Sequence, residues 1–225
     1  MGDKKLVQKK TVQTNSVTTR VCKPKNFIII PKVMPTSVID IDGEKSANYL
    51  NCPDLAPSQY AYLFKAETRF LTATNFLAQT SINTLQRQRV LDWMTVLHGK
   101  FCDTQETLFI AVNYFDRLLA GKDVIPDQLQ TFAATALYTA SKFEEIYPIP
   151  IDDLCGVSDG IEGIALSPIS MRKAELELLK VLKFQLNPPL KNHFLRRCSM
   201  AAGATVELHV LSKFLIEVTF FLHIC

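Results

Sequence analysis

The sequence predicts an all-α protein, and three observations support this prediction. Apolar residues make up 48% of the 225 residues, which is typical of a globular protein with a substantial core. From Ser58 onward these residues recur at intervals of three and four, the period of an amphipathic helix. No stretch alternates convincingly between apolar and polar residues, as a half-buried β-strand would. We therefore expect a helical bundle.

The first 57 residues differ from the rest in charge and in pattern. Residues 1–32 contain eight lysines and arginines but a single aspartate, whereas residues 58–200 contain fifteen basic and fifteen acidic side chains. Five prolines interrupt residues 1–57, and no sustained helical period is present there. We interpret residues 1–57 as a basic, mostly disordered leader. It is either a localisation signal or electrostatic tether, or a solvated tail without a specific role.

Three amphipathic stretches predict helices in the first half of the remaining chain. One begins near Tyr60, just after a proline, which suits a first helical turn. The apolar face of the second consists of Val90, Trp93, Met94 and Leu97. The third begins with Asp103 followed three residues later by Glu106, which is the spacing of a capping box, and it ends at Gly121.

Further helices are predicted in the second half. An Ala-rich stretch after Pro126 is expected to be the central helix, because small side chains let neighbouring helices approach closely. It is predicted to end at Tyr147–Pro148, where proline removes a backbone donor. A short helix is expected around Ile151–Cys155. Ser167, followed by a proline, has the features of an N-cap for the next long helix.

The sequence lacks the motifs of enzymes and of cofactor or metal sites. It contains no Gly-rich nucleotide loop, no nucleophile elbow and no HExxH, and its four histidines are far apart. The acids of one loop match no calcium-binding loop and are interpreted as a solvated surface, namely Asp152, Asp153, Asp159 and Glu162. We therefore expect neither an enzyme nor a bound cofactor or metal.

Charge, cysteine usage and hydropathy exclude further classes of protein. A formal net charge of +3 is not the balance of a nucleic-acid binder. Six scattered cysteines without a CxxC motif or a secretory signal favour reduced thiols in the cytosol or nucleus. The longest run without a formal charge, Phe70–Gln86, has 17 residues and many polar side chains, so it is too short and too polar to span a bilayer. No membrane partner is expected.

Four charged residues interrupt the apolar pattern of the predicted helices. Arg87 lies one turn before the Trp93 stripe, and Asp116 directly follows a core phenylalanine. Lys142 lies near the end of the Ala-rich helix, and Glu175 lies inside the next long helix. A long charged side chain beside a core is costly unless it is paired. These residues form either two partly buried ion pairs or ordinary boundary charges.

Three blocks of sequence resemble the cyclin box. The first comprises Arg87–Trp93 and Glu106–Arg117, the second is Ala140–Pro148, and the third is Glu175 with Leu179–Leu186. They have the order and spacing found in cyclins, over about residues 58–200. The motif Lys-Phe-Glu-Glu-Ile-Tyr-Pro is most similar to that of the mitotic A/B-type cyclins. The resemblance implies an N-terminal cyclin box of five helices preceded by an N-terminal helix.

The same resemblance implies a function. Cyclins are regulatory subunits that bind and activate cyclin-dependent Ser/Thr protein kinases in cell-cycle control, in the nucleus and cytoplasm. In cyclins the positions matching Arg87 and Asp116 form a buried structural pair. Those matching Lys142 and Glu175 pair on the surface that holds a mobile kinase helix. The resemblance implies apolar kinase contacts at Phe143, Leu179, Phe184 and Leu186.

A second surface departs from the family pattern. Cyclins that recruit substrates carry an apolar docking patch on the first box helix, with an acid nearby. The matching positions in this chain are Gln86, Arg89, Val90, Trp93 and Gln130, with Val96 in place of the acid. Only the tryptophan and the second glutamine keep the family residue. Because Gln and Arg interrupt the apolar surface, we expect weak or absent binding of basic-apolar docking peptides.

Residues 201–225 contain one more apolar stretch, which resembles the opening of a second cyclin repeat. A single helix cannot bury its own apolar face. We expect either a truncated repeat or a helix that packs on the first box or on another molecule.

Other functions of the same fold stay open. They are a transcriptional-type cyclin, a cyclin-fold scaffold that activates no kinase, a retinoblastoma-type pocket protein and a DNA-binding module like transcription factor IIB. The last needs a basic helical face, which the neutral charge of residues 58–200 disfavours.

Overall fold

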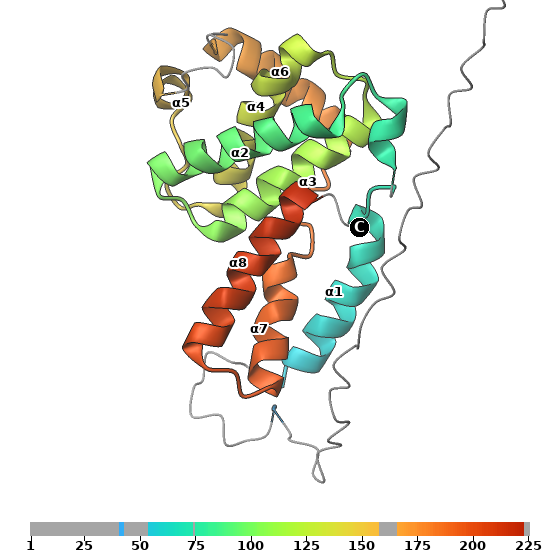
Figure 1. Ribbon diagram of the computed structural model, residues 1–225, viewed down its shortest axis with the longest axis vertical. Coiled ribbons are helices and arrows are strands. Elements are labelled where there is room, and N and C mark those ends of the chain that lie inside the picture. Colours follow the sequence, from blue (N-terminus) through green and yellow to red (C-terminus); the bar gives the residue numbers. More distant parts are fainter. Residues whose placement is uncertain (1–40, 43–53, 74, 158–165, 223–225) are drawn as a thin grey trace, which may run out of the picture. The chain divides into compact units, whose positions relative to one another are not determined.

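The computed structural model describes residues 41–42, 54–73, 75–157 and 166–222, which belong to one compact unit, residues 39–225. Across these ranges the regular elements are all helical, which confirms the predicted all-α class (Figure 1). The elements are α1 (Ala56–Phe70), η2 (Phe76–Gln79), α2 (Thr84–Phe101), α3 (Gln105–Gly121), α4 (Pro126–Glu144), α5 (Ile151–Val157), α6 (Pro168–Leu182), α7 (Lys191–Ala201) and α8 (Val206–Leu222). The predicted leader lies almost entirely outside the described residues.

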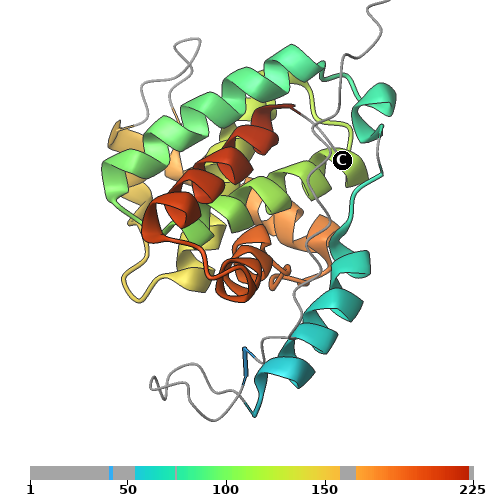
Figure 2. The same cartoon turned by 60° about the horizontal axis from the view of Figure 1, so that its bottom comes forward.

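Helix α4 forms the centre of the bundle, with α2, α3, α5 and α6 packed around it (Figures 1 and 2). Four of its alanines are completely buried, namely Ala133, Ala134, Ala136 and Ala140. Because alanine adds only a methyl group to the helix surface, several neighbours can approach the same helix closely. The Ala-rich pattern therefore explains why this segment is central.

Two of the predicted helix ends are wrong, and one interaction explains both. Helix α4 ends at Glu144 rather than at Tyr147–Pro148, because Glu145 adopts an extended backbone conformation. Its carboxylate turns back to the start of α3, where Thr104 is the N-cap residue and makes no side-chain capping bond of its own. The predicted capping box of Asp103 and Glu106 is therefore not formed. A carboxylate from a different helix caps α3.

Other predicted ends agree with the structure. Ser167 caps α6, since its hydroxyl accepts a hydrogen bond of 3.1 Å from the Ser170 amide. Helix α3 ends at Gly121, as predicted, but for a reason of packing. A β-carbon at this position would lie 2.7 Å from Cγ1 of Val181 in α6. The absence of a side chain therefore lets α3 and α6 approach each other closely.

Helix α8 lies beside α7 and α2 (Figure 2). Its two halves differ in how far their apolar side chains are buried. Near its C-terminal end Ile216, Phe220 and Phe221 pack against the core, and the Phe220 ring meets that of Phe109 edge to face at 4.7 Å. The apolar residues of its first half are more than half exposed, namely Val206, Leu208, Val210, Leu211, Phe214 and Leu215. Of the described helices, none has both the length and the apolar character needed to cross a membrane.

Candidate functional site

The structure joins Lys142 of α4 to Glu175 of α6 in an ion pair at the surface of the bundle. The lysine side chain is 38% exposed and the glutamate side chain 15% exposed. The Lys142 ammonium lies 4.4 Å from the centre of the Tyr138 ring, a cation–π contact. The Thr139 hydroxyl lies 3.4 Å from Oε1 of Glu175. Neighbouring side chains on α4 thus contact both members of the pair, while the lysine still faces solvent.

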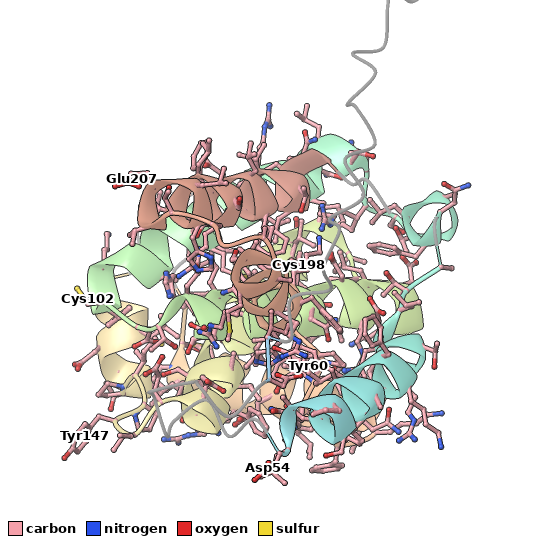
Figure 3. The ribbon with its side chains drawn as sticks, turned by 90° about the horizontal axis from the view of Figure 1, so that it is seen from below. Asp54, Tyr60, Cys102, Tyr147, Cys198 and Glu207 are labelled. Carbon is pink, nitrogen blue, oxygen red and sulfur yellow. The ribbon has the colours of Figure 1, made fainter. Side chains whose placement is uncertain are left out.

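Apolar side chains lie on the two helices that carry this pair and on the segment that follows α6. Phe143 is 43% exposed and Phe184 is 66% exposed, whereas Leu179 and Leu186 are half-buried. The segment after α4 adds Ile146 and Tyr147, which are 88% and 89% exposed, and Figure 3 shows Tyr147 projecting from the body. Large exposed apolar residues near one ion pair are typical of a surface that binds another protein.

Arg117 of α3, for which no role was predicted, fixes the turn that carries Phe184. Lys183 and Phe184 both have positive φ, at 53° and 57°, which costs a residue with a β-carbon about 1–2 kcal/mol. Arg117 donates hydrogen bonds to the carbonyl oxygens of Gln185 and Leu182, at 2.9 and 3.2 Å. A cation at the C-terminal end of a helix is favourable, because it faces the unpaired carbonyls of the last turn. Arg117 therefore stabilises a strained turn.

Tyr114 holds the next residues of that segment. Its hydroxyl donates a hydrogen bond of 2.6 Å to the carbonyl oxygen of Leu186. The ring is completely buried, and this burial raises the pKa of the Tyr114 hydroxyl well above its ordinary value. The tyrosine is therefore neutral at physiological pH and keeps its donor proton. Leu186 is anchored from the core side.

A capping carboxylate fixes the other end of this surface. Glu145 accepts hydrogen bonds of 2.8 Å from both the amide and the hydroxyl of Thr104, and a third from the hydroxyl of Thr107. Burial acts to raise the pKa of Glu145, but the hydrogen bonds from the two threonines outweigh it and hold this pKa below its ordinary value. The segment after Lys142 is thereby attached to the start of α3.

A second ion pair lies at the meeting point of α2, α3 and α8. Arg87 donates two parallel hydrogen bonds to Asp116, Nε to Oδ1 at 2.7 Å and Nη2 to Oδ2 at 2.8 Å. Its remaining nitrogen, Nη1, donates to the carbonyl oxygen of Phe220 at 2.8 Å. The neighbouring Gln88 donates to the carbonyl oxygen of Phe221 at 2.7 Å. Arg87 and its neighbour Gln88 thus also bind the C-terminal end of α8, a contact that the sequence did not predict.

The five positions of the docking patch do not form an open apolar surface. Val90 is 5% exposed and Gln130 is 4% exposed, and the partly buried Trp93 packs against the core. The side chain of Gln86 accepts a hydrogen bond of 2.9 Å from the amide of Asn83, as part of the capping box that begins α2. Of the five positions only Arg89 is fully exposed.

Across the described ranges, no group of three or more histidine, cysteine, aspartate or glutamate side chains is placed to hold a metal ion. Of the cysteines in the described ranges, Cys102, Cys155 and Cys198 form no disulfide. The acidic loop predicted as a solvated surface lies in part outside the described residues.

Comparison with known proteins identifies the family. Residues 58–187 match the model of the cyclin N-terminal domain. The chain belongs to the cyclin family. It is 37% identical over 190 residues to the G2/mitotic-specific cyclin-B of Arbacia punctulata, a match that covers 84% of this chain and 46% of the relative. It is 38% identical over 180 residues to the G2/mitotic-specific cyclin-B2 of Homo sapiens, covering 80% of this chain and 44% of the relative.

These relatives confirm the resemblance to mitotic cyclins that the sequence blocks predict. The aligned part of this cyclin spans somewhat less than half the length of either relative. A solved structure of a viral cyclin from herpesvirus saimiri matches with a TM-score of 0.58 and 22% identity, covering 67% of this chain and 65% of the viral one. That likeness confirms the cyclin fold. Together, the family and the fold support a regulatory role.

Proposed function

We propose that this cyclin binds a cyclin-dependent Ser/Thr protein kinase and activates it in cell-cycle control. The observation that carries the proposal is the Lys142–Glu175 pair, which joins α4 to α6 at the surface and is accompanied by the exposed rings of Phe143 and Phe184. Relatives named G2/mitotic-specific cyclins favour the cell-cycle role over the transcriptional-type alternative. A location in the nucleus and cytoplasm stays a prediction from the family.

The chemistry of the pair suits the capture of a helix. The ends of a helix expose unpaired amide and carbonyl groups, which a carboxylate and an ammonium can bind. Apolar side chains around such contacts exclude water and strengthen them. In protein kinases the lysine–glutamate pair that orients ATP forms only when one mobile helix is docked. A partner that holds this helix in place therefore activates the enzyme.

The test is the charge reversal Lys142→Glu, with Lys122→Glu as its matched control. Lys122 forms a comparable surface ion pair with Glu177, also a residue of α6. We expect Lys142→Glu to retain the helical circular dichroism of the wild type but to lose co-purification with a cyclin-dependent kinase and stimulation of histone phosphorylation. Lys122→Glu should keep both. Undiminished kinase activation by Lys142→Glu would refute the assignment.

Substrate recruitment through the docking patch is proposed to be weak. Two of its five positions are buried and a third caps a helix, so a docking peptide meets little apolar surface there. Titration of a labelled basic-apolar docking peptide should show no saturable binding at micromolar concentrations. Micromolar or tighter affinity that is lost on Trp93→Ala would contradict this proposal.

A further inference from the structure

Helix α1 lies at the edge of the bundle and buries little of its surface (Figures 1 and 2). Of its fifteen residues, only two alanines are buried. The Tyr60 hydroxyl donates a hydrogen bond of 3.1 Å to the carbonyl oxygen of His193 in α7. The Phe64 ring lies 5.0 Å from that of Phe194, also in α7. An element with so few buried apolar contacts belongs to the least stable part of a fold, so each contact matters for its docking.

The last residue of α1 contacts the bundle through Arg117 of α3. The guanidinium carbon of Arg117 lies 5.0 Å from the centre of the Phe70 ring, a cation–π contact. Burial lowers the pKa of Arg117, but an arginine stays protonated at physiological pH. Such a contact is stronger where water is partly excluded from the cation. The Phe70 ring therefore stabilises the charged guanidinium from the side of α1.

The same guanidinium holds the turn that follows α6. Its hydrogen bonds go to the carbonyl oxygens of Leu182 and Gln185, the first and last residues of this four-residue turn. The two residues between them, Lys183 and Phe184, have positive φ. Because Phe184 is 66% exposed, burial does not hold its side chain in place, and the order of the turn depends on its hydrogen bonds. One side chain thus contacts the end of α1 and both ends of the turn.

We propose that Arg117 is a positioning residue that couples the docking of α1 to the order of this turn, and thereby raises the affinity for the kinase that Phe184 contacts. When α1 is docked, the Phe70 ring covers one side of the guanidinium and keeps it directed at the two carbonyl oxygens. When α1 leaves, water competes for the guanidinium, and the turn with two residues of positive φ loses part of its support. The effect on kinase affinity rests on the proposed function, whereas the coupling within the chain does not.

The coupling is reciprocal. If docked α1 favours the ordered turn, a partner bound to the ordered turn must stabilise the docked position of α1 by the same free energy. Helix α1 need not touch that partner for this to hold. A change at the edge of the bundle can therefore alter kinase affinity through Arg117 alone.

Amide hydrogen exchange of the free chain tests the coupling without a kinase. Phe70→Leu keeps an apolar side chain but removes the face of the aromatic ring. It should speed exchange of the Phe184 and Gln185 amides about fivefold, which is the strength of a partly exposed cation–π contact. Phe70→Tyr retains the ring face and should stay within twofold of the wild type. The matched control is Phe64→Leu, the same change at a ring of α1 that packs on α7, and it should also stay within twofold.

A double-mutant cycle shows whether Arg117 transmits the effect. Arg117→Lys keeps the charge but loses the planar fork that binds two carbonyl oxygens, so it should speed exchange of the same amides at least tenfold. In the Arg117→Lys background, Phe70→Leu should have little further effect. If the two effects add instead, the coupling does not pass through Arg117, and the inference is overturned.

Kinase binding by the same variants completes the test. Phe70→Leu should weaken the affinity for a cyclin-dependent kinase about fivefold but leave maximal histone phosphorylation at saturating cyclin unchanged, because the Lys142–Glu175 pair is intact. Unchanged exchange in Phe70→Leu, or faster exchange with unchanged kinase affinity, would overturn the inference. Lys142→Glu should lose the kinase but keep wild-type exchange in the turn. If the wild type binds no kinase, the proposed function fails, and the exchange rates still decide whether α1 and the turn are coupled.

Discussion

Two of the ion pairs that join helices of this cyclin differ in how completely the fold satisfies their charges. In the pair of Arg87 and Asp116 the side chains are 3% and 19% exposed, the contact is bidentate, and the third guanidinium nitrogen bonds a backbone carbonyl. In the pair of Lys142 and Glu175 the lysine is 38% exposed and retains donor capacity towards solvent. The protein itself therefore satisfies the charges of the first pair, whereas the lysine of the second pair is accessible to a partner.

Because of this difference in burial, we expect the Arg87–Asp116 pair to contribute to folding stability and the Lys142–Glu175 pair to contribute to partner binding. A buried ion must be compensated within the fold, because its transfer from water costs several kcal/mol. Removal of one partner then leaves the other charge buried and unpaired. An ion at the surface keeps part of its hydration, so its partner adds little to folding. Similar charges inside apolar helices can thus serve the fold in one place and recognition in another.

The largest expected effect is that of Arg87→Ala. This change leaves Asp116 without its partner and removes the bond to the carbonyl oxygen of Phe220. We expect the free energy of unfolding to fall by about 3–5 kcal/mol. Thermal unfolding followed by circular dichroism measures it, and the midpoint should fall by about 10 °C.

The double variant Arg87→Met/Asp116→Leu is the control for this prediction. It removes both charges together and replaces them with apolar side chains, so no unpaired ion stays buried. The double variant should lose less stability than Arg87→Ala alone. If the two variants prove equally unstable, the buried charge is not the cause, and the contrast between the two ion pairs fails.

Glu145→Gln should have an intermediate effect. It extends the comparison to a carboxylate that forms no ion pair within the described part of the chain and is bound by hydroxyl and amide groups. The glutamate accepts three hydrogen bonds from Thr104 and Thr107. Neutralisation weakens them, because bonds to a charged acceptor are roughly twice as strong, so we expect a loss of about 1 kcal/mol at neutral pH. Urea unfolding at neutral pH, with kinase co-purification alongside, measures the effect on stability and on the surface.

The pH dependence of this loss follows from the pKa of Glu145, which the fold holds below its ordinary value of 4.5. Its contribution to stability is present above that ordinary value and is lost as the pH falls through the lower value of the folded state. The wild type and Glu145→Gln should therefore converge in acid. Glu144→Gln is the opposite control. Burial, then repulsion from Glu106 and Glu145, raises the pKa of Glu144, so removal of its charge should not destabilise the protein at neutral pH.

The sequence predicted what depends on local pattern. Periodic apolar residues located the helices, and Ser167 marked the start of α6. The four charged residues at Arg87, Asp116, Lys142 and Glu175 were recognisable because each interrupts an apolar stretch, and the resemblance to cyclins proposed how they pair. A side chain that conflicts with its local pattern is thus a signal that a single sequence can supply.

Contacts between residues far apart in the chain could not be predicted in the same way. Glu145 caps α3 across a separation of 41 residues, and the predicted capping box of Asp103 and Glu106 was wrong because a carboxylate from the end of α4 occupies that place. The bond from Arg87 to Phe220 spans 133 residues. Nothing in the sequence marks Glu145 or Phe220 as the partner of a residue so far away in the chain, so only the packing of the helices shows these contacts.

The smallest expected effect on stability is that of Lys142→Met, in contrast to the large loss expected for Arg87→Ala. Methionine keeps much of the apolar length of lysine but removes the charge, while Glu175 keeps the Thr139 hydroxyl and access to solvent. We expect the free energy of unfolding to change by less than about 1 kcal/mol, because exposed ion pairs contribute little to folding. Co-purification with a cyclin-dependent kinase should nevertheless be lost. Denaturant unfolding and pull-down on the same preparation measure the two quantities. If the free energy of unfolding fell by several kcal/mol, the Lys142–Glu175 pair would be a structural pair like that of Arg87 and Asp116, and not a binding site for a partner.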